Sequence, residues 1–113
     1  MAKVLSKTQK KIDHNVRRAL SDAYELFLGN IIGFQSLSHQ ADYSNFPASL
    51  LMHCVFDTDE HQQQACQNGE ATKMQNLIQA KLLKVGVVLK VPKHQVIFDN
   101  NEARVLADTQ LDG

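Results

Sequence analysis

A long amphipathic segment near the start of the chain constrains the fold more than any other feature. Across residues 8–28, apolar side chains recur at intervals of three and four, the spacing that lines one face of an α-helix. The stripe consists of Ile12, Val16, Ala19, Leu20, Ala23, Phe27 and Leu28. Ser6 and Gln9 predict a capping box at the start of this helix, and Gly29-Asn30 predicts its end. A helix with one apolar face needs a partner layer, so the segment predicts a packed domain.

The segments that follow this helix include two pairs of predicted strands. Apolar and polar side chains mostly alternate in residues 34–43, and residues 49–56 form an apolar run suited to a central strand covered on both faces. The turn-forming residues 44–48 predict that the two segments form an antiparallel hairpin. Two more short strands are predicted at residues 87–91 and 94–98, separated by a proline and a lysine.

Helical patterns fill the interval between the two strand pairs. The sequence DTDE at positions 57–60 predicts an aspartate N-cap and a short helix that ends near residue 68. Residues 70–85 predict a second long helix, and Gly86 is its expected C-cap. The sequence DNNE at positions 99–102 repeats the helix-start pattern and predicts a last short helix to about residue 107.

These elements predict a single α+β domain in the order α-β-β-α-α-β-β-α. A chain of 113 residues is long enough for one core. We expect two layers, with a mainly antiparallel sheet of about four strands and the two long helices on one face. Residues 1–7 and 108–113 are expected to be frayed ends.

Charge is balanced overall but unevenly distributed along the chain. The formal net charge is zero, yet the first eighteen residues carry six basic side chains against one acidic one, Asp13. This stretch could contact the phosphates of a nucleic acid, bind an acidic region of the same or another chain, or form a solvated helix face. The predicted nucleic-acid-binding residues are Lys3, Lys7, Lys10, Lys11, Arg17 and Arg18. The low aromatic content and the absence of tryptophan argue against a stacking platform for single strands.

The two D-x-x-E segments suggest a possible metal site. Asp57 and Asp99 each follow or end a predicted strand, and converging carboxylates could hold Mg²⁺ or Mn²⁺ for phosphodiester chemistry. Helix capping explains the same two aspartates without a metal.

Other catalytic signatures are not found in the sequence. The five histidines and two cysteines have none of the spacings of a zinc site, and Cys54 and Cys66 are expected to be reduced, packed thiols. His39 and His53 lie on strands that are expected to pair and could be close in space. No phosphate-binding loop or nucleophile-elbow motif occurs, so no cofactor is predicted.

The loop of the predicted hairpin is rich in apolar rings. Tyr43, Phe46 and Pro47 could anchor a partner protein if they are exposed. Alternatively, Phe46 covers the end of the sheet.

Several segments resemble a family of small uncharacterised proteins from marine and related gammaproteobacteria, over roughly residues 10–105. The segments are Gly33-Phe34, Tyr43-Ser44-Asn45-Phe46-Pro47, Cys54-Val55-Phe56-Asp57-Thr58, Leu82-Leu83-Lys84-Val85-Gly86 and Phe98-Asp99-Asn100-Asn101-Glu102. Some members of that family are described as Fis-like transcriptional regulators. The resemblance implies a bacterial cytosolic protein and implies no activity or site residues.

Taken together, these features predict a non-enzymatic binding or regulatory module that acts through its sheet or hairpin surface. We expect homo-oligomerisation, a possible protein partner, a cytoplasmic location and no membrane association, because no secretion signal or apolar run long enough for a membrane span is seen. The alternatives are weak nucleic-acid binding through the first helix and a metal-dependent phosphodiesterase or nuclease.

Overall fold

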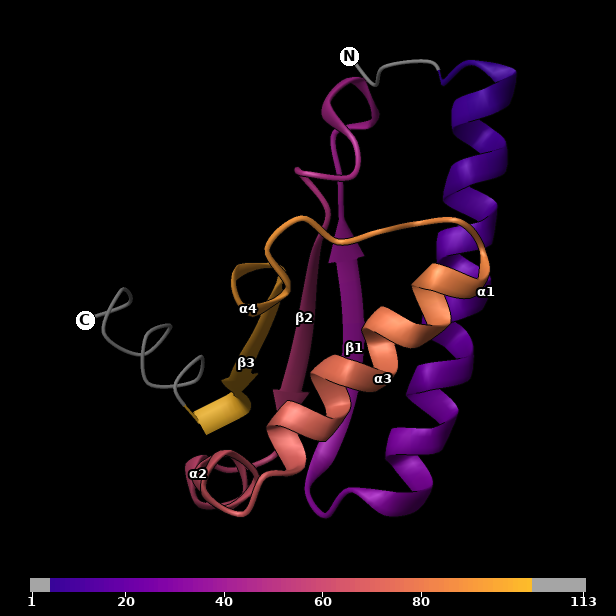
Figure 1. Cartoon of the computed structure of the whole chain (residues 1–113). Helices are drawn as coiled ribbons and strands as arrows, with labels where there is room; N and C mark the ends of the chain where they lie inside the picture. Colours follow the sequence, from indigo (N-terminus) through magenta and orange to yellow (C-terminus); the bar gives the residue numbers. More distant parts are fainter. Residues whose placement is uncertain (1–4, 103–113) are drawn as a thin grey trace, which may run out of the picture.

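The chain folds into an α+β domain, as the sequence predicts. The computed structural model describes residues 5–102. Its elements, shown in Figure 1, are α1 (Lys7–Asn30), β1 (Phe34–Gln40), the 3₁₀ helix η1 (Tyr43–Asn45), β2 (Leu51–Phe56), α2 (Asp59–Gln67), α3 (Glu70–Lys84), α4 (Pro92–Gln95) and β3 (Val96–Asn100).

The long helix α1 forms as predicted, including its capping box. The Ser6 hydroxyl accepts a hydrogen bond from the Gln9 N–H at 3.1 Å, and the Gln9 side chain accepts one from the Ser6 N–H at 3.0 Å. The helix ends at Asn30, close to the predicted end, but neither Gly29 nor Asn30 has the left-handed conformation of a helix-ending residue. The chain turns instead at Gly33, whose φ of 82° is in the left-handed region.

Within residues 5–102, the sheet has three strands and a mixed pattern, which corrects the prediction of a mainly antiparallel sheet of about four strands. The order is β1-β2-β3, with β2 in the centre. β1 and β2 form the predicted antiparallel hairpin, with Leu37 opposite Cys54. β3 pairs with β2 in parallel, with Val96 opposite Met52. Parallel pairing follows from the connection, because the helices after β2 return the chain to the end of the sheet where β2 begins.

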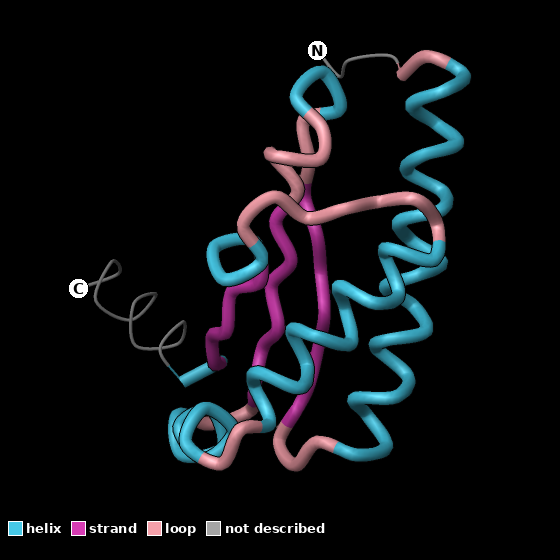
Figure 2. The backbone as a smooth tube through the Cα atoms, in the orientation of Figure 1, coloured by secondary structure: helices cyan, strands magenta, loops and turns pink. Residues whose placement is uncertain are grey.

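The predicted strand at residues 87–91 is also wrong. This segment crosses the sheet as an extended loop (Figure 2). Val87 and Leu89 are buried while Val88 is 59 % exposed. The side chains therefore alternate between buried and exposed as in a strand, although the backbone of this segment is not paired in the sheet. The strand predicted at residues 94–98 begins later, since residues 92–95 form the short helix α4 with proline at its start.

One core lies between the sheet and the helices. Met52, Cys54 and Phe56 of β2 are fully buried and belong to the same cluster as the apolar stripes of α1 and α3. These two helices cover one face of the sheet, as predicted (Figure 1).

The structure describes residues 5–7 of the predicted frayed N-terminal segment. Lys7, in the predicted frayed N-terminal segment, already belongs to α1. A helical turn begins at Asn101, and the rest of the predicted last helix and of the frayed C-terminal segment lies outside the described residues.

Candidate functional site

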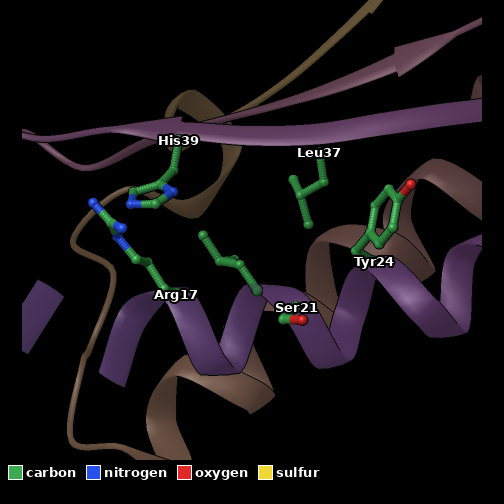
Figure 3. A pocket seen from close by; sticks show the side chains of 6 residues that line it. Arg17, Ser21, Tyr24, Leu37 and His39 are labelled. Atoms are coloured by element: carbon green, nitrogen blue, oxygen red, sulfur yellow. The ribbon is translucent and has the colours of Figure 1, made fainter. Parts of the chain in front are cut away.

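A pocket of about 280 Å³ lies between α1 and the edge strand β1 (Figure 3). We call it the α1–β1 groove. Its lining residues are Arg17, Leu20, Ser21 and Tyr24 from α1 and Leu37 and His39 from β1.

The helical spacing of α1 and the strand spacing of β1 explain why these side chains lie together. The α1 residues are spaced three and four apart and therefore share one flank of the helix. Leu37 and His39 are two apart and therefore share one face of β1. The flank of α1 next to α3 carries different residues, among them Asn15 and Arg18. The groove thus lies on the side of α1 away from α3, beside the edge of the sheet.

At the polar end of the groove, the carboxylate of Asp13 lies next to both Arg17 and His39. Arg17 donates from Nε to Asp13 Oδ2 at 2.8 Å, and His39 Nε2 lies 3.8 Å from Asp13 Oδ1. The Asp13 side chain is only 18 % exposed, whereas that of Arg17 is 70 % exposed. The carboxylate therefore fixes the guanidinium while leaving its terminal N–H groups accessible to a ligand.

The hairpin loop also contributes a residue to this polar cluster. The Tyr43 hydroxyl donates to Asp13 Oδ1, and its ring stacks on Phe46 with centroids 5.2 Å apart. Burial raises the pKa of Tyr43 well above its usual value, and the bond to the Asp13 carboxylate raises it further. The hydroxyl therefore remains a proton donor to Asp13 throughout the physiological range.

The structure places the three predicted partner-binding residues of the loop in this packing. Tyr43, Phe46 and Pro47 are each half-buried, and the Pro47 carbonyl accepts a hydrogen bond from Gln95 Nε2 at 2.9 Å. Phe46 packs against the core, in line with the alternative that it covers the end of the sheet. A partner-anchoring role for the loop stays a prediction.

Asp57 and Asp99 lie at the same end of the sheet, because β2 and β3 are parallel. Asp57 Oδ1 lies 2.6 Å from His61 Nδ1, and Asp99 Oδ1 accepts a hydrogen bond from the Asn100 N–H at 2.8 Å. Within residues 5–102, no group of three or more His, Cys, Asp or Glu side chains is placed to hold a metal ion. The metal hypothesis therefore gains no support from the described residues.

Asp57 also does not cap α2. The N-cap is Thr58, whose hydroxyl accepts from the His61 N–H at 3.1 Å. Asp57 instead binds the His61 side chain, and that hydrogen bond lowers the pKa of the Asp57 carboxyl. His61 packs directly over Gly33, so the pair links the start of α2 to the turn before β1.

His39 and His53 lie on strands that pair as expected, but their side chains are on opposite faces of the sheet. His53 is opposite Ser38 and His39 is opposite Met52, so the two histidines are offset by one residue. A one-residue offset reverses the face of a side chain. Only His39 faces α1, where it lines the groove.

The predicted basic stretch is divided between two surfaces. Lys7, Lys10, Lys11 and Arg18 are exposed on α1, whereas Arg17 points into the α1–β1 groove (Figure 3). Lys3 lies outside the described residues.

The cysteines differ in their surroundings. Cys54 is fully buried, and burial raises the pKa of its thiol to about 12, so this thiol is packed as expected. Cys66 is exposed, which corrects the expectation that it is packed.

The sequence contained a partial signal for the groove. Asp13 and Arg17 are four residues apart, which is the spacing of an ion pair on a helix. Ser21 and Tyr24 were missed because no local pattern shows which flank of α1 borders β1.

Comparison with known proteins adds no family assignment. Of the helices described, none has the length and apolar character needed to cross a membrane. No protein-family model, curated protein or solved structure was found to match this chain.

Proposed function

We propose that the chain is a protein-binding module that adds an extended peptide segment along the free edge of β1. The observation that carries the proposal is the position of the α1–β1 groove beside an edge strand. Strand addition of this kind combines backbone hydrogen bonds with pockets for alternate side chains.

The backbone of β1 is suited to such pairing. In an edge strand, every second residue directs its N–H and C=O groups away from the sheet. Proteins that protect an edge against pairing often place proline or lysine on it. The seven residues of β1, FQSLSHQ, contain neither. Among residues 5–102, no strand pairs with this edge, and its regular part runs from residue 36 to residue 40, beyond the irregularity near Phe34.

The groove supplies the side-chain contacts. Leu20 and Leu37 form an apolar surface with the ring of Tyr24, which suits an aliphatic side chain of the peptide. Arg17 and His39 lie at the polar end, where an acidic residue of the peptide would find N–H donors. The ligand is thus an extended segment with an aliphatic residue close to an acidic one.

A selection experiment tests this assignment. Random twelve-residue peptides displayed on phage would be selected on the wild-type protein, and enriched peptides would be synthesised with a fluorescent label. In the enriched peptides, we expect aliphatic residues at every second position and an acidic residue nearby. Hydrogen exchange should show protection of β1 amides when the peptide is added.

Two matched pairs of variants locate the site. Ser21→Trp fills the groove and should weaken peptide binding at least about tenfold, a loss of about 1.4 kcal/mol. Asp22→Trp places the same bulk on the other flank of α1, next to α3, and should have little effect. Arg17→Glu should weaken the acidic peptides, whereas Arg18→Glu should not.

The expected homo-oligomer would compete for the same edge. If sedimentation shows a dimer, and if β1 amides are already protected without peptide, a second copy of the chain occupies the edge. That result, or equal losses in Ser21→Trp and Asp22→Trp, would contradict the peptide-binding proposal.

A further inference from the structure

A second hollow, separate from the α1–β1 groove, lies between α1 and α3. It has a volume of about 230 Å³ and is lined by Asn15, Arg18, Ala19, Asp22, Lys81, Lys84 and Val85. Three cations from two helices therefore border one hollow, against one carboxylate. The sequence alone did not associate the two lysines with the basic stretch, because more than sixty residues separate them from Arg18.

Further cations on α1 extend this charged surface. Lys7, Lys11 and Arg18 are spaced four and seven apart, so they follow one line along the helix. We call the set of Lys7, Lys11, Arg18, Lys81 and Lys84 the basic ridge.

Asp22 is the one carboxylate that borders the hollow, and within residues 5–102 no ridge cation forms an ion pair with it. Within residues 5–102, the ion pairs are Arg17 with Asp13, His39 with Asp13 and His61 with Asp57. None of them involves the ridge. Arg17 is thus partly neutralised by a carboxylate, while Arg18, its neighbour in the sequence, keeps its charge available for a ligand.

We propose that the basic ridge binds the phosphate backbone of a nucleic-acid duplex without reading its sequence. A duplex carries one negative charge per about 1.7 Å of its axis, so a line of cations on a rigid helix can contact several phosphates at once. The hollow suits a phosphate group because Arg18, Lys81 and Lys84 border it from both helices. A lipid surface fits less well, because the apolar residues of the hollow, Ala19 and Val85, are buried or half-buried.

Fluorescence anisotropy with a labelled DNA duplex of about twenty base pairs tests the proposal. If all five cations contact phosphates, the slope of log affinity against log salt is about −4.5. Binding should then fall several hundredfold between about 50 and 200 mM salt. A second duplex of unrelated sequence should bind with the same affinity.

A triple variant identifies the contacts. Arg18→Gln/Lys81→Gln/Lys84→Gln leaves two ridge cations, so the same increase in salt should weaken binding only about tenfold. The control is Lys73→Gln/Lys90→Gln/Lys93→Gln, which removes the same charge outside the ridge and should bind like the wild type. Circular dichroism checks that both variants are folded.

Three outcomes overturn the proposal. The first is no binding of either duplex at low salt. The second is an equal loss in both triple variants, which indicates an effect of net charge alone. The third is binding to vesicles containing phosphatidylserine without binding to the duplex, which assigns the surface to a membrane.

The Arg18→Gln/Lys81→Gln/Lys84→Gln variant should retain peptide binding at the α1–β1 groove, so the two proposals can fail independently.

Discussion

Arg17 and Arg18 are adjacent in the sequence but lie on different flanks of α1, beside the two different proposed binding sites. Arg17 and Arg18 differ by about 100° around the helix axis. Arg17 therefore contacts Asp13 and borders the α1–β1 groove, whereas Arg18 borders the hollow next to α3. The helical phase could have been read from the sequence, but the neighbour on each flank could not.

Gly33 is a residue whose replacement should be more damaging than its exposure suggests. A Cβ at this position would lie 2.5 Å from the His61 side chain, and φ is 82°. At Gly69, φ is 86°, and a Cβ there would have no neighbour within 4 Å. Gly69→Ala should therefore lose about 1–2 kcal/mol from backbone strain alone, and Gly33→Ala should lose more.

Thermal or urea unfolding measures this difference. His61→Ala in the Gly33→Ala background should recover part of the additional loss, because it removes Nδ1 and Cγ, two of the three His61 atoms nearest to the new methyl group. Equal losses in Gly33→Ala and Gly69→Ala would show that the contact with His61 is unimportant.

The pair of Asp57 and His61 should make stability depend on acid pH. The hydrogen bond from His61 lowers the pKa of Asp57 in the folded state. The pair therefore contributes stability above the unfolded-state pKa of about 3.9, and this contribution disappears as pH falls through the lower folded-state value. Urea unfolding between about pH 6 and 3 should show a smaller acid-induced loss in Asp57→Asn than in the wild type. Asp59→Asn is the control and should keep the wild-type dependence.

At the level of elements, the helices and the hairpin could be predicted because their signals are local. Residues 8–28 and 70–85 have the apolar period of helices, and both helices are found close to these bounds. Residues 87–91 misled the prediction because Val87 and Leu89 alternate with exposed residues as in a strand. Alternation reports which side chains are buried, but it does not report whether the backbone has a strand beside it.

Gln95 connects the crossing loop, residues 87–91, to the segment that precedes β2. Its side chain, buried at 4 % exposure, accepts from the Val91 N–H at 2.8 Å and donates to the carbonyls of Pro47 and Leu50 at 2.9 and 3.0 Å. Gln95→Met keeps the approximate size of the side chain but removes the hydrogen-bonding partner of these three backbone groups. We expect a loss of about 2–4 kcal/mol in the free energy of unfolding, measured with urea.

The neighbouring residue in the same helix is the control for this prediction. His94 is exposed, so His94→Ala should change stability by less than about 0.5 kcal/mol. A Gln95→Met variant as stable as His94→Ala would show that water replaces the buried hydrogen bonds.

For the whole molecule, strand order was the feature that sequence patterns could not supply. Met52 pairs with Val96, and the three helices α2, α3 and α4 separate their strands in the sequence. Both strands have apolar residues that suit a central or an edge position equally well. Their parallel arrangement depends on how α2, α3 and the crossing loop return the chain to the sheet, which is a property of the packed domain.

A chain that ends at residue 95 tests the contribution of β3 to the whole domain. It keeps α1, the hairpin and α3 but leaves the second edge of β2 without a strand. We expect it to aggregate at concentrations where the full chain stays dispersed, as measured by light scattering. A dispersed and cooperatively folding shortened chain would show that β2 does not need β3.

The same arrangement has a consequence for synthesis on the ribosome. The hairpin can form once residue 56 has emerged, but β2 acquires its parallel neighbour only after residues 96–100 have been made. During that interval the most apolar strand of the chain has an unoccupied side, and α1 alone can cover its face until α3 has also been made. The nascent chain is therefore exposed to misassociation until residues 96–100 have emerged.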